Sequence, residues 1–333
     1  MYTAREIKAG IILSFAWRAI LANFIYATVL CSISFIGKVP IGISFVPIGL
    51  IGTAVAFYVG FKNNSSYERL WEARRIWGSV VNASRTWGAF VIANVKSTGL
   101  VADEASKEQQ SKLIHRHIAY VNAMRIQLRQ KAVWNEDSNI AREVVKQHNP
   151  SDNSPLKDDL LHFMPEVEVN YVLARKNPAT QIMKMQAKHL DELYKNNAIH
   201  ELFYFQLMNL VQEFYNQQGA AERIKNFPFP RQYAYFSKVF VQLLILVLPF
   251  GLINEFAKLG GNLVWLAIPC HIVISWVFTT MEVVGDTSEN PFENAINDVP
   301  MTAICRTIEI DLREMLEEEN IPAPIQAVNN ILM

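Results

Sequence analysis

The chain has 333 residues, and its 31 basic and 31 acidic side chains give a formal net charge of zero at pH 7. This balance provides no overall attraction for nucleic acid, and we expect no nucleic-acid partner. Apolar residues make up 51% of the sequence and are concentrated toward both ends, which favours a membrane protein over the two soluble domains that the length alone would suggest.

The first apolar stretch predicts a membrane span from about Ala19 to Ile36. Before it we expect a short interfacial helix that ends at Trp17-Arg18, because a tryptophan ring suits the headgroup level of a bilayer. The following Gly37-Lys38-Val39-Pro40 is long enough only for a turn. The first and second spans are therefore expected to form a hairpin.

The second apolar stretch, from Val39 to Phe61, contains no charged residue. At about 1.5 Å rise per residue, a helix of this length crosses a hydrocarbon core of about 30 Å. Lys62, Arg69 and Arg74 follow, and such a basic flank is typical of the cytoplasmic side. The chain is therefore expected to leave the membrane at Phe61 and to enter the cytoplasm.

Thr53, Phe57 and Phe61 are spaced four residues apart, so they share one face of the second span. On an isolated membrane helix, a line of phenylalanines packs against lipid or another helix more often than it lines a pore. The spacing alone therefore leaves the role of this face open.

Residues 62–236 are charged and amphipathic, and no run among them is long enough to cross a bilayer. We expect a cytoplasmic helical domain in which 67–95 continues the second helix and 103–130 forms a packed helix. After Asn177-Pro178 the pattern predicts one long helix from about Ala179 to Gln217.

Two further apolar runs predict spans at Val239–Asn254, which is interrupted by Pro249, and at Leu263–Met281. Four spans place both termini in the cytoplasm. His271 lies near the middle of the fourth span, where we favour a neutral imidazole bonded to a neighbouring helix over a functional ionisable group. The chain then divides into 1–61, 62–236, 237–281 and a C-terminal cytoplasmic segment, 282–333.

Motifs for catalysis or metal binding are absent from the sequence. It has no glycine-rich phosphate loop, no Gly-x-Ser-x-Gly elbow and no Cys-x-x-Cys pair, and its three cysteines lack metal-site spacing. His115 and His117 diverge on a helix, and we interpret them as ordinary solvated histidines. We expect no catalytic residue, no bound metal and no cofactor.

Three ordered blocks are distributed over nearly the whole chain: GFKNNSSYERLWEARRIWG from Gly60, RIKNFPFPRQYAYF from Arg223 and ENPFENAINDVP from Glu289. Their characteristic residues are Gly60, Arg69, Trp71, Glu72 and Arg74 in the first block, Pro228 and Pro230 in the second, and Asn290, Pro291, Phe292 and Asp298 in the third. In these residues and their order the chain resembles the bestrophin family.

The resemblance implies an all-α membrane protein with four transmembrane helices and a cytoplasmic helical domain, assembled as a homopentamer in the bacterial inner membrane. Its expected partners are further copies of itself, monovalent ions and membrane lipid. By the same resemblance, Thr53, Phe57 and Phe61 form the narrow neck of a pore on the five-fold axis. A second, cytoplasmic aperture would follow the motif that Asn177-Pro178 resembles, with Ile182 the first choice and Ala179 the next.

The third block departs from the calcium-gated animal members, whose acidic run clasps calcium. Ala295 and Asn297 stand in place of acidic residues, which leaves Glu293 and Asp298 as the carboxylates after the proline. Calcium takes six to eight oxygen ligands, several of them from carboxylates. We therefore expect no calcium clasp and interpret the block as a structural turn.

The function that the resemblance implies is a passive ion channel that conducts chloride and other monovalent anions. Some bacterial relatives favour cations, and a phenylalanine ring offers a positive edge to anions and a negative face to cations, so the sign of the ion stays open. A membrane scaffold or regulatory subunit that conducts nothing is the alternative from another class. A membrane-bound enzyme has less support, because no catalytic constellation is present.

Overall fold

The computed structural model describes residues 1–4, 6, 9–96, 102–130, 155–295, 297–328 and 330–333. Within these residues the fold is helical, and β structure is limited to isolated bridges near the two chain ends. The all-α prediction is confirmed for this part of the chain. The elements are α1 (Ala9–Phe35), α2 (Phe45–Asn94), α3 (Ala102–Arg129), α5 (Leu156–Leu161), α6 (Glu166–Leu173), α7 (Pro178–Lys195), α8 (Glu201–Asn226), α9 (Arg231–Leu259), the 3-10 helix η1 (Gly261–Leu266), α10 (Ala267–Ser288) and α11 (Met301–Met315).

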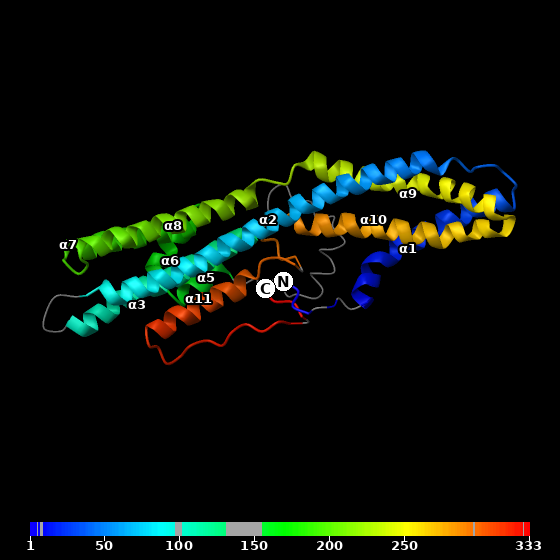
Figure 1. Cartoon of the computed structure of the whole chain (residues 1–333). Helices are drawn as coiled ribbons and strands as arrows, with labels where there is room; N and C mark the ends of the chain where they lie inside the picture. The colour runs from blue at the N-terminus through cyan, green and yellow to red at the C-terminus, as the bar shows by residue number, and fades with distance from the viewer. Residues whose placement is uncertain (5, 7–8, 97–101, 131–154, 296, 329) are drawn as a thin grey trace.

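Four helices among the described residues are long and apolar enough to cross a membrane, which confirms the prediction of four membrane-length apolar helices. They are α1, α2, α9 and α10. Figure 1 shows α1, α9, α10 and the first part of α2 gathered at one end of an elongated molecule, which we call the apolar half. The other end, the polar half, contains α3, α5 to α8, α11 and the rest of α2.

The long helix α2 runs through both halves (Figure 1). Helices α9 and α10 pack on its first part, and α8 and α11 pack on its second part. The prediction that the second span continues into the polar half is confirmed. The helix begins at Phe45 rather than Val39, because Ser44 caps it and the residues before Ser44 leave the helical conformation.

Three helix boundaries differ from the sequence prediction. Helix α1 runs without a break through Trp17-Arg18, where we expected two pieces. The single long helix expected after Asn177-Pro178 is wrong: α7 ends at Lys195 and α8 begins at Glu201. The reason is local, because Asn197 has a positive φ of 57° and the His200 side chain caps the new helix. Helix α8 also passes Gly219 and ends at Asn226.

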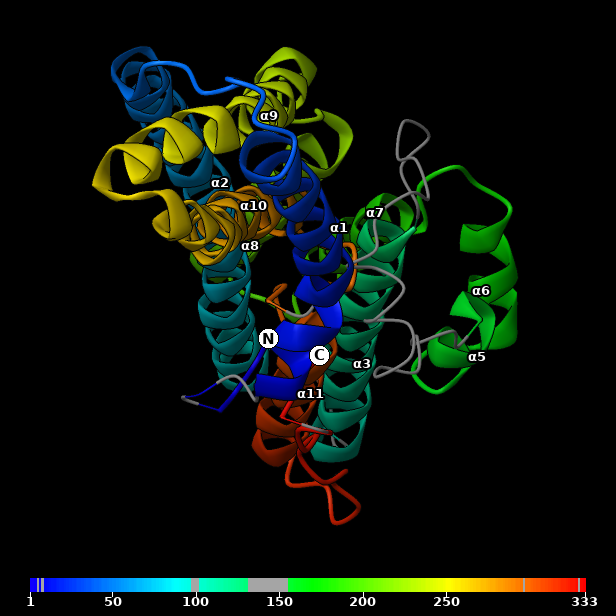
Figure 2. The same ribbon diagram turned by 90° about the vertical axis from the view of Figure 1, so that its right-hand side faces the viewer.

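Each half has its own cluster of buried apolar side chains. In the polar half the cluster is built around the large buried rings of Trp77, Trp87, Tyr120 and Phe214. His117 is buried among these rings, so its interpretation as a solvated histidine is wrong. Figure 2 shows α5 and α6 on one side of α3, and Leu160, Val169 and Val172 of these two helices belong to the same cluster.

The first and last residues of the chain lie side by side (Figures 1 and 2). The backbone N–H of Thr3 donates to the carbonyl of Asn330 at 2.8 Å, and that of Leu332 donates to the carbonyl of Met1 at 2.9 Å. Met333 accepts a hydrogen bond from the backbone of Ala303, at the start of α11. Both ends are therefore held at the junction between the two halves.

Candidate functional site

A line of exposed side chains along α2 is the candidate functional site. Thr53, Phe57 and Phe61 are all exposed, with Phe57 at 65% and Phe61 at 72% of full exposure. Val55 and Val59, on the other face of the helix, are buried in the apolar cluster. The line continues at steps of three and four residues, and we call it the α2 stripe: Val46, Leu50, Thr53, Phe57, Phe61, Asn64, Glu68, Trp71 and Arg75.

The α2 stripe changes character along its length. It is apolar from Val46 to Phe61 except at Thr53, and it becomes polar from Asn64 onward. The Thr53 hydroxyl donates to the carbonyl of Gly49 at 3.0 Å, within its own helix. Its proton is therefore already used, and Thr53 presents an acceptor oxygen rather than a donor on the stripe.

A hollow of about 510 Å³ lies beside the polar end of the stripe. Both signs of charge are present on its walls beside the rings of Trp71 and Phe229, so its lining is mixed rather than that of an apolar binding pocket. It is lined by Ser65, Glu68, Arg69, Trp71, Glu72, Arg75 and Phe229.

The first signature block holds α2 against the end of α8. The Arg69 guanidinium donates to the carbonyls of Ile224 and Phe227, which are left without helical partners where α8 ends. Glu72 pairs with Arg223 at 2.7 Å. Trp71 stacks on Tyr67, with ring centroids 6.4 Å apart, and it stays half exposed on the stripe. Arg69 and Glu72 therefore fix the position of α2.

The glycine and the prolines of the signature differ in what they do within the single chain. A Cβ atom added at Gly60 would meet nothing within 4 Å, so packing inside this chain does not require glycine there. Pro228 and Pro230 occupy the short connection between α8 and α9, and Pro230 is the N-cap of α9. A proline there suits the end of one helix and the start of the next.

The third signature block is a turn organised by Asp298. One oxygen of its carboxylate accepts the backbone N–H of Phe292 at 2.8 Å and of Val299 at 2.7 Å. The other oxygen accepts the N–H of Asn294 at 2.8 Å and the Arg129 guanidinium at 3.1 Å. Phe292 and Asn294 have positive φ angles of 74° and 67°, so the carboxylate holds a conformation that these residues rarely adopt.

The burial of Ile182 and Ala179 contradicts their assignment to an aperture. Both side chains are fully buried, in the cluster that packs α7 against its neighbours. A side chain enclosed within one chain cannot face an axis between copies. Their position along the sequence does not tell which face of α7 they occupy. In the structure both lie on the face that packs against the neighbouring helices.

His271 is fully buried in α10 and makes two kinds of contact. Its ring lies 3.4 Å from the Ser275 hydroxyl on the same helix and has an edge contact with Tyr26 of α1, with ring centroids 6.0 Å apart. The contact with a neighbouring helix is aromatic, and the hydrogen bond stays within α10. This differs from the bond across helices that the sequence suggested.

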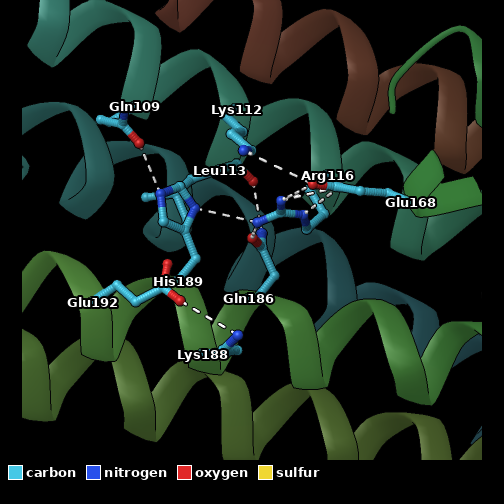
Figure 3. A network of polar contacts seen from close by, with 9 residues as sticks. All are labelled: Gln109, Lys112, Leu113, Arg116, Glu168, Gln186, Lys188, His189 and Glu192. Carbon is cyan, nitrogen blue, oxygen red and sulfur yellow. Dashed lines mark hydrogen bonds and ion pairs between the residues drawn. The ribbon is translucent and has the colours of Figure 1, made fainter. Parts of the chain in front are cut away.

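A second polar cluster lies in the polar half, around the buried Arg116 (Figure 3). Its guanidinium forms a bidentate ion pair with Glu168, with a shortest N–O distance of 2.9 Å. It also donates a hydrogen bond to Nδ1 of His189 at 3.2 Å. Since arginine only donates, Nδ1 must accept, and Nε2 of His189 carries the proton that is donated to Gln109 at 2.8 Å. Nothing in the sequence pattern pointed to this network, because its members come from three separate segments.

We expect the melting temperature of the detergent-solubilised protein to fall as the pH is lowered from 7.5 to 5. Burial lowers the pKa of His117 to about 3, and burial with the nearby Arg116 and Lys112 charges lowers that of His189 to about 4. At these histidines the unfolded chain takes up protons below pH 6.5 and the folded chain does not, so stability is lost. Burial raises the pKa of Glu289 to about 7, and protonation of this carboxyl in the folded chain offsets part of the loss. The fully buried His117 contributes up to about 1.4 kcal/mol per pH unit, and the partly exposed His189 less.

Melting curves of His117→Gln over this pH range test the expectation, because the variant should flatten the slope whatever its stability at pH 7.5. His162→Gln, which changes an exposed histidine, should keep the slope of the original protein. An unchanged slope in His117→Gln would contradict the assignment.

A family model for the bacterial and fungal bestrophin protein matches residues 2–314 of this chain. The voltage-dependent anion channel-forming protein YneE of Escherichia coli K12 is 28% identical over 322 residues, which cover 95% of this chain and 91% of that protein. The voltage-dependent anion channel-forming protein sll1024 of Synechocystis is 24% identical over 280 residues, which cover 84% of this chain and 79% of that protein. The crystal structure of a bacterial bestrophin homologue from Klebsiella pneumoniae, 24% identical, covers 90% of this chain and 98% of that chain with a TM-score of 0.75.

Proposed function

This chain belongs to the bacterial and fungal bestrophin family, and from this we propose that it forms an anion channel in the membrane. Relatives that match most of its length are named as voltage-dependent anion channel-forming proteins. These names are those of channels, so the prediction that the chain is not an enzyme is confirmed. The observation that carries the proposal is the α2 stripe, whose apolar part from Val46 to Phe61 is an exposed line of aromatic and aliphatic side chains along a membrane-length helix.

A pore requires more than one copy of the stripe, because one helix cannot surround an ion. We propose that five copies of the chain assemble with their α2 stripes around a common axis. Thr53, Phe57 and Phe61 then form three rings, and the polar hollow beside Arg69 and Trp71 opens below them. The exposure of Phe57 and Phe61 in the single chain supports this arrangement.

Ion flux through purified protein in liposomes tests the function, and native mass measurement in mild detergent tests the assembly. We expect chloride-dependent flux, a reversal potential that follows the anion gradient, and a mass near five times 37.9 kDa. A reversal potential that follows the cation gradient would assign the opposite selectivity. A protein of this mass without flux would favour a scaffold, and a monomer in every mild detergent would count against a channel.

We propose that the apolar half, formed by 1–61 and 237–281, crosses the inner membrane, and that 62–236 and 282–333 lie in the cytoplasm with both termini. Single cysteines at Lys38, in the turn before α2, and at the exposed Lys188 of α7 should then react from opposite sides of the membrane. The background carries Cys270→Ser, since Cys31 and Cys305 are buried. Reaction of both sites with an impermeant reagent from one side would contradict this topology.

Removal of calcium should leave the flux nearly unchanged. Asp298 already accepts three backbone N–H groups and the Arg129 guanidinium, and Glu293 pairs with Lys225 at 3.2 Å. Few carboxylate oxygens are left for an ion that takes six to eight oxygen ligands. Flux recorded before and after chelation checks this expectation. A steep loss on chelation that calcium restores would show that the third block does bind the ion.

A further inference from the structure

A buried ion pair joins three helices directly after the Phe61 position. The Lys62 ammonium lies 2.7 Å from a carboxylate oxygen of Glu282 on α10, and the two side chains are 1% and 13% exposed. The Ser237 hydroxyl of α9 donates to the other oxygen of Glu282. The next residue on α2, Asn63, donates from its side chain to the carbonyl of Met281 at 2.9 Å.

Helix α10 approaches α2 closely at this level. A Cβ atom on Gly285 would lie 2.0 Å from the side-chain oxygen of Asn63 and 3.8 Å from a side-chain carbon of Lys62. A larger residue would therefore displace the Asn63 amide and disturb its hydrogen bond to the Met281 carbonyl. The glycine leaves room for the Asn63 side chain beside the ion pair.

The remainder of the α2 contact in the apolar half combines aliphatic packing with one aromatic contact, in which Tyr58 stacks on Tyr233 and meets Phe240 of α9 edge-on. Ile48, Val55 and Val59 pack in the apolar cluster with side chains of α9 and α10. The aliphatic contacts have no preferred direction, and in lipid they gain little from the hydrophobic effect, so they fix the rotation of a helix about its axis only weakly. Tyr58 adds a directional contact, but only toward α9. The described hydrogen bonds from α2 to α9 and α10 are those of Lys62 and Asn63.

We propose that Lys62, Glu282 and Ser237 act as positioning residues that set the rotation of α2, and with it the direction of Phe57 and Phe61. Consecutive residues of a helix are about 100° apart, so holding Lys62 toward Glu282 holds Phe61 on the adjoining exposed face. Phe57 lies one turn earlier and follows it. The inference rests on the proposed function and deepens it, because it names the residues that set the direction of the Phe57 and Phe61 side chains in the proposed neck.

The pair has a second property that the test must separate from positioning. It is neutral, so five copies place no net charge at the end of the proposed neck. If Lys62 and Glu282 acted only as local charges, Lys62→Met and Glu282→Gln would shift the reversal potential in opposite directions. If they position α2, both single variants should also change conductance in the same direction, and a double variant that keeps the site neutral should change conductance without shifting the reversal potential.

Two double variants avoid an unpaired buried charge, which can prevent folding. Lys62→Met/Glu282→Gln removes the directional bond and keeps the packing, and Lys62→Glu/Glu282→Lys restores an ion pair with its signs exchanged. A cysteine at position 61, in a chain with Cys270→Ser, reports direction through its rate of modification by a water-soluble thiol reagent. The matched control is Lys258→Met/Glu255→Gln, which removes an exposed 2.8 Å pair on α9.

We expect the neutral double variant to slow modification of the position 61 cysteine several-fold, and the charge-exchanged variant to recover at least half of the original rate. The control should match the original rate. Equal rates in all four proteins, or no recovery on charge exchange, would overturn the proposal. The labelling rate does not depend on ion flux. If the protein showed no flux, the proposed channel function would be contradicted, but the labelling rates would still test the role of the ion pair.

Discussion

Replacing Phe57 or Phe61 with alanine should raise the single-channel conductance several-fold. In the proposed pentamer these side chains form two stacked apolar rings, and an ion that enters them loses water that no side chain there replaces. Alanine widens each ring and lets water stay with the ion. Thr53 forms the ring above, and its hydroxyl oxygen can still accept a hydrogen bond from water, so this ring should exclude water less than the two phenylalanine rings.

The same substitutions should leave the fold and the assembly nearly unchanged. Phe57 and Phe61 are 65% and 72% exposed in the single chain, so their truncation leaves no cavity inside it. We expect a loss of at most about 0.5 kcal/mol, whereas a phenylalanine packed in a core costs about 3–5 kcal/mol when truncated. Phe24→Ala is a matched control, because Phe24 is 47% exposed on α1.

Single-channel recording with size-exclusion profiles of all three variants checks both expectations. Phe24→Ala should conduct like the original protein. If Phe57→Ala and Phe61→Ala instead break the assembly and leave conductance unchanged or lower, the stripe packs between helices and does not line the pore.

Replacing Asp298 with alanine should destabilise the protein by about 3–5 kcal/mol, the usual cost of breaking a buried ion pair by removing one partner. The substitution leaves Arg129 buried without its carboxylate and removes the acceptor of three backbone N–H groups. The turn at Phe292 and Asn294 then loses what holds its positive φ angles. Arg129 lies in α3, so the packing of the third block on the polar half should loosen as well.

Thermal melting in detergent, with the oligomer followed by size exclusion, measures this loss. Asp311→Ala is the control, because Asp311 pairs with Arg85 at the surface, where an ion pair contributes about 0–1 kcal/mol. Equal melting temperatures for Asp298→Ala and Asp311→Ala would show that the turn does not depend on the Asp298 carboxylate.

The features that the sequence predicted well depend on local composition. The four membrane-length helices follow from long uncharged runs, and the extension of α2 follows from helical periodicity without an internal proline after Pro47. The split between α7 and α8 was missed because asparagine fits both a helix and a left-handed turn, and only the packing at Asn197 decides between them.

The parts of the candidate site that could not be predicted depend on residues far apart in the chain. Spacing gave the shared face of Thr53, Phe57 and Phe61, but it could not say that α9 and α10 leave this face uncovered. The Lys62 and Glu282 pair joins positions 220 residues apart. Ile182 was misassigned for the same reason, because its face is set by contacts with other helices.

The unbroken course of α2 has a mechanical consequence. A helix of 50 residues is a rod of about 75 Å, stiff enough that its two ends turn together. Arg69 and Glu72 bind it to α8 through a hydrogen bond and an ion pair, and Arg85 forms an ion pair with Asp311 of α11 further along. A torque applied at the far end, where α11 and α8 pack on α2, would therefore act on the Lys62 and Glu282 pair that we propose sets the rotation of the helix beside Phe61.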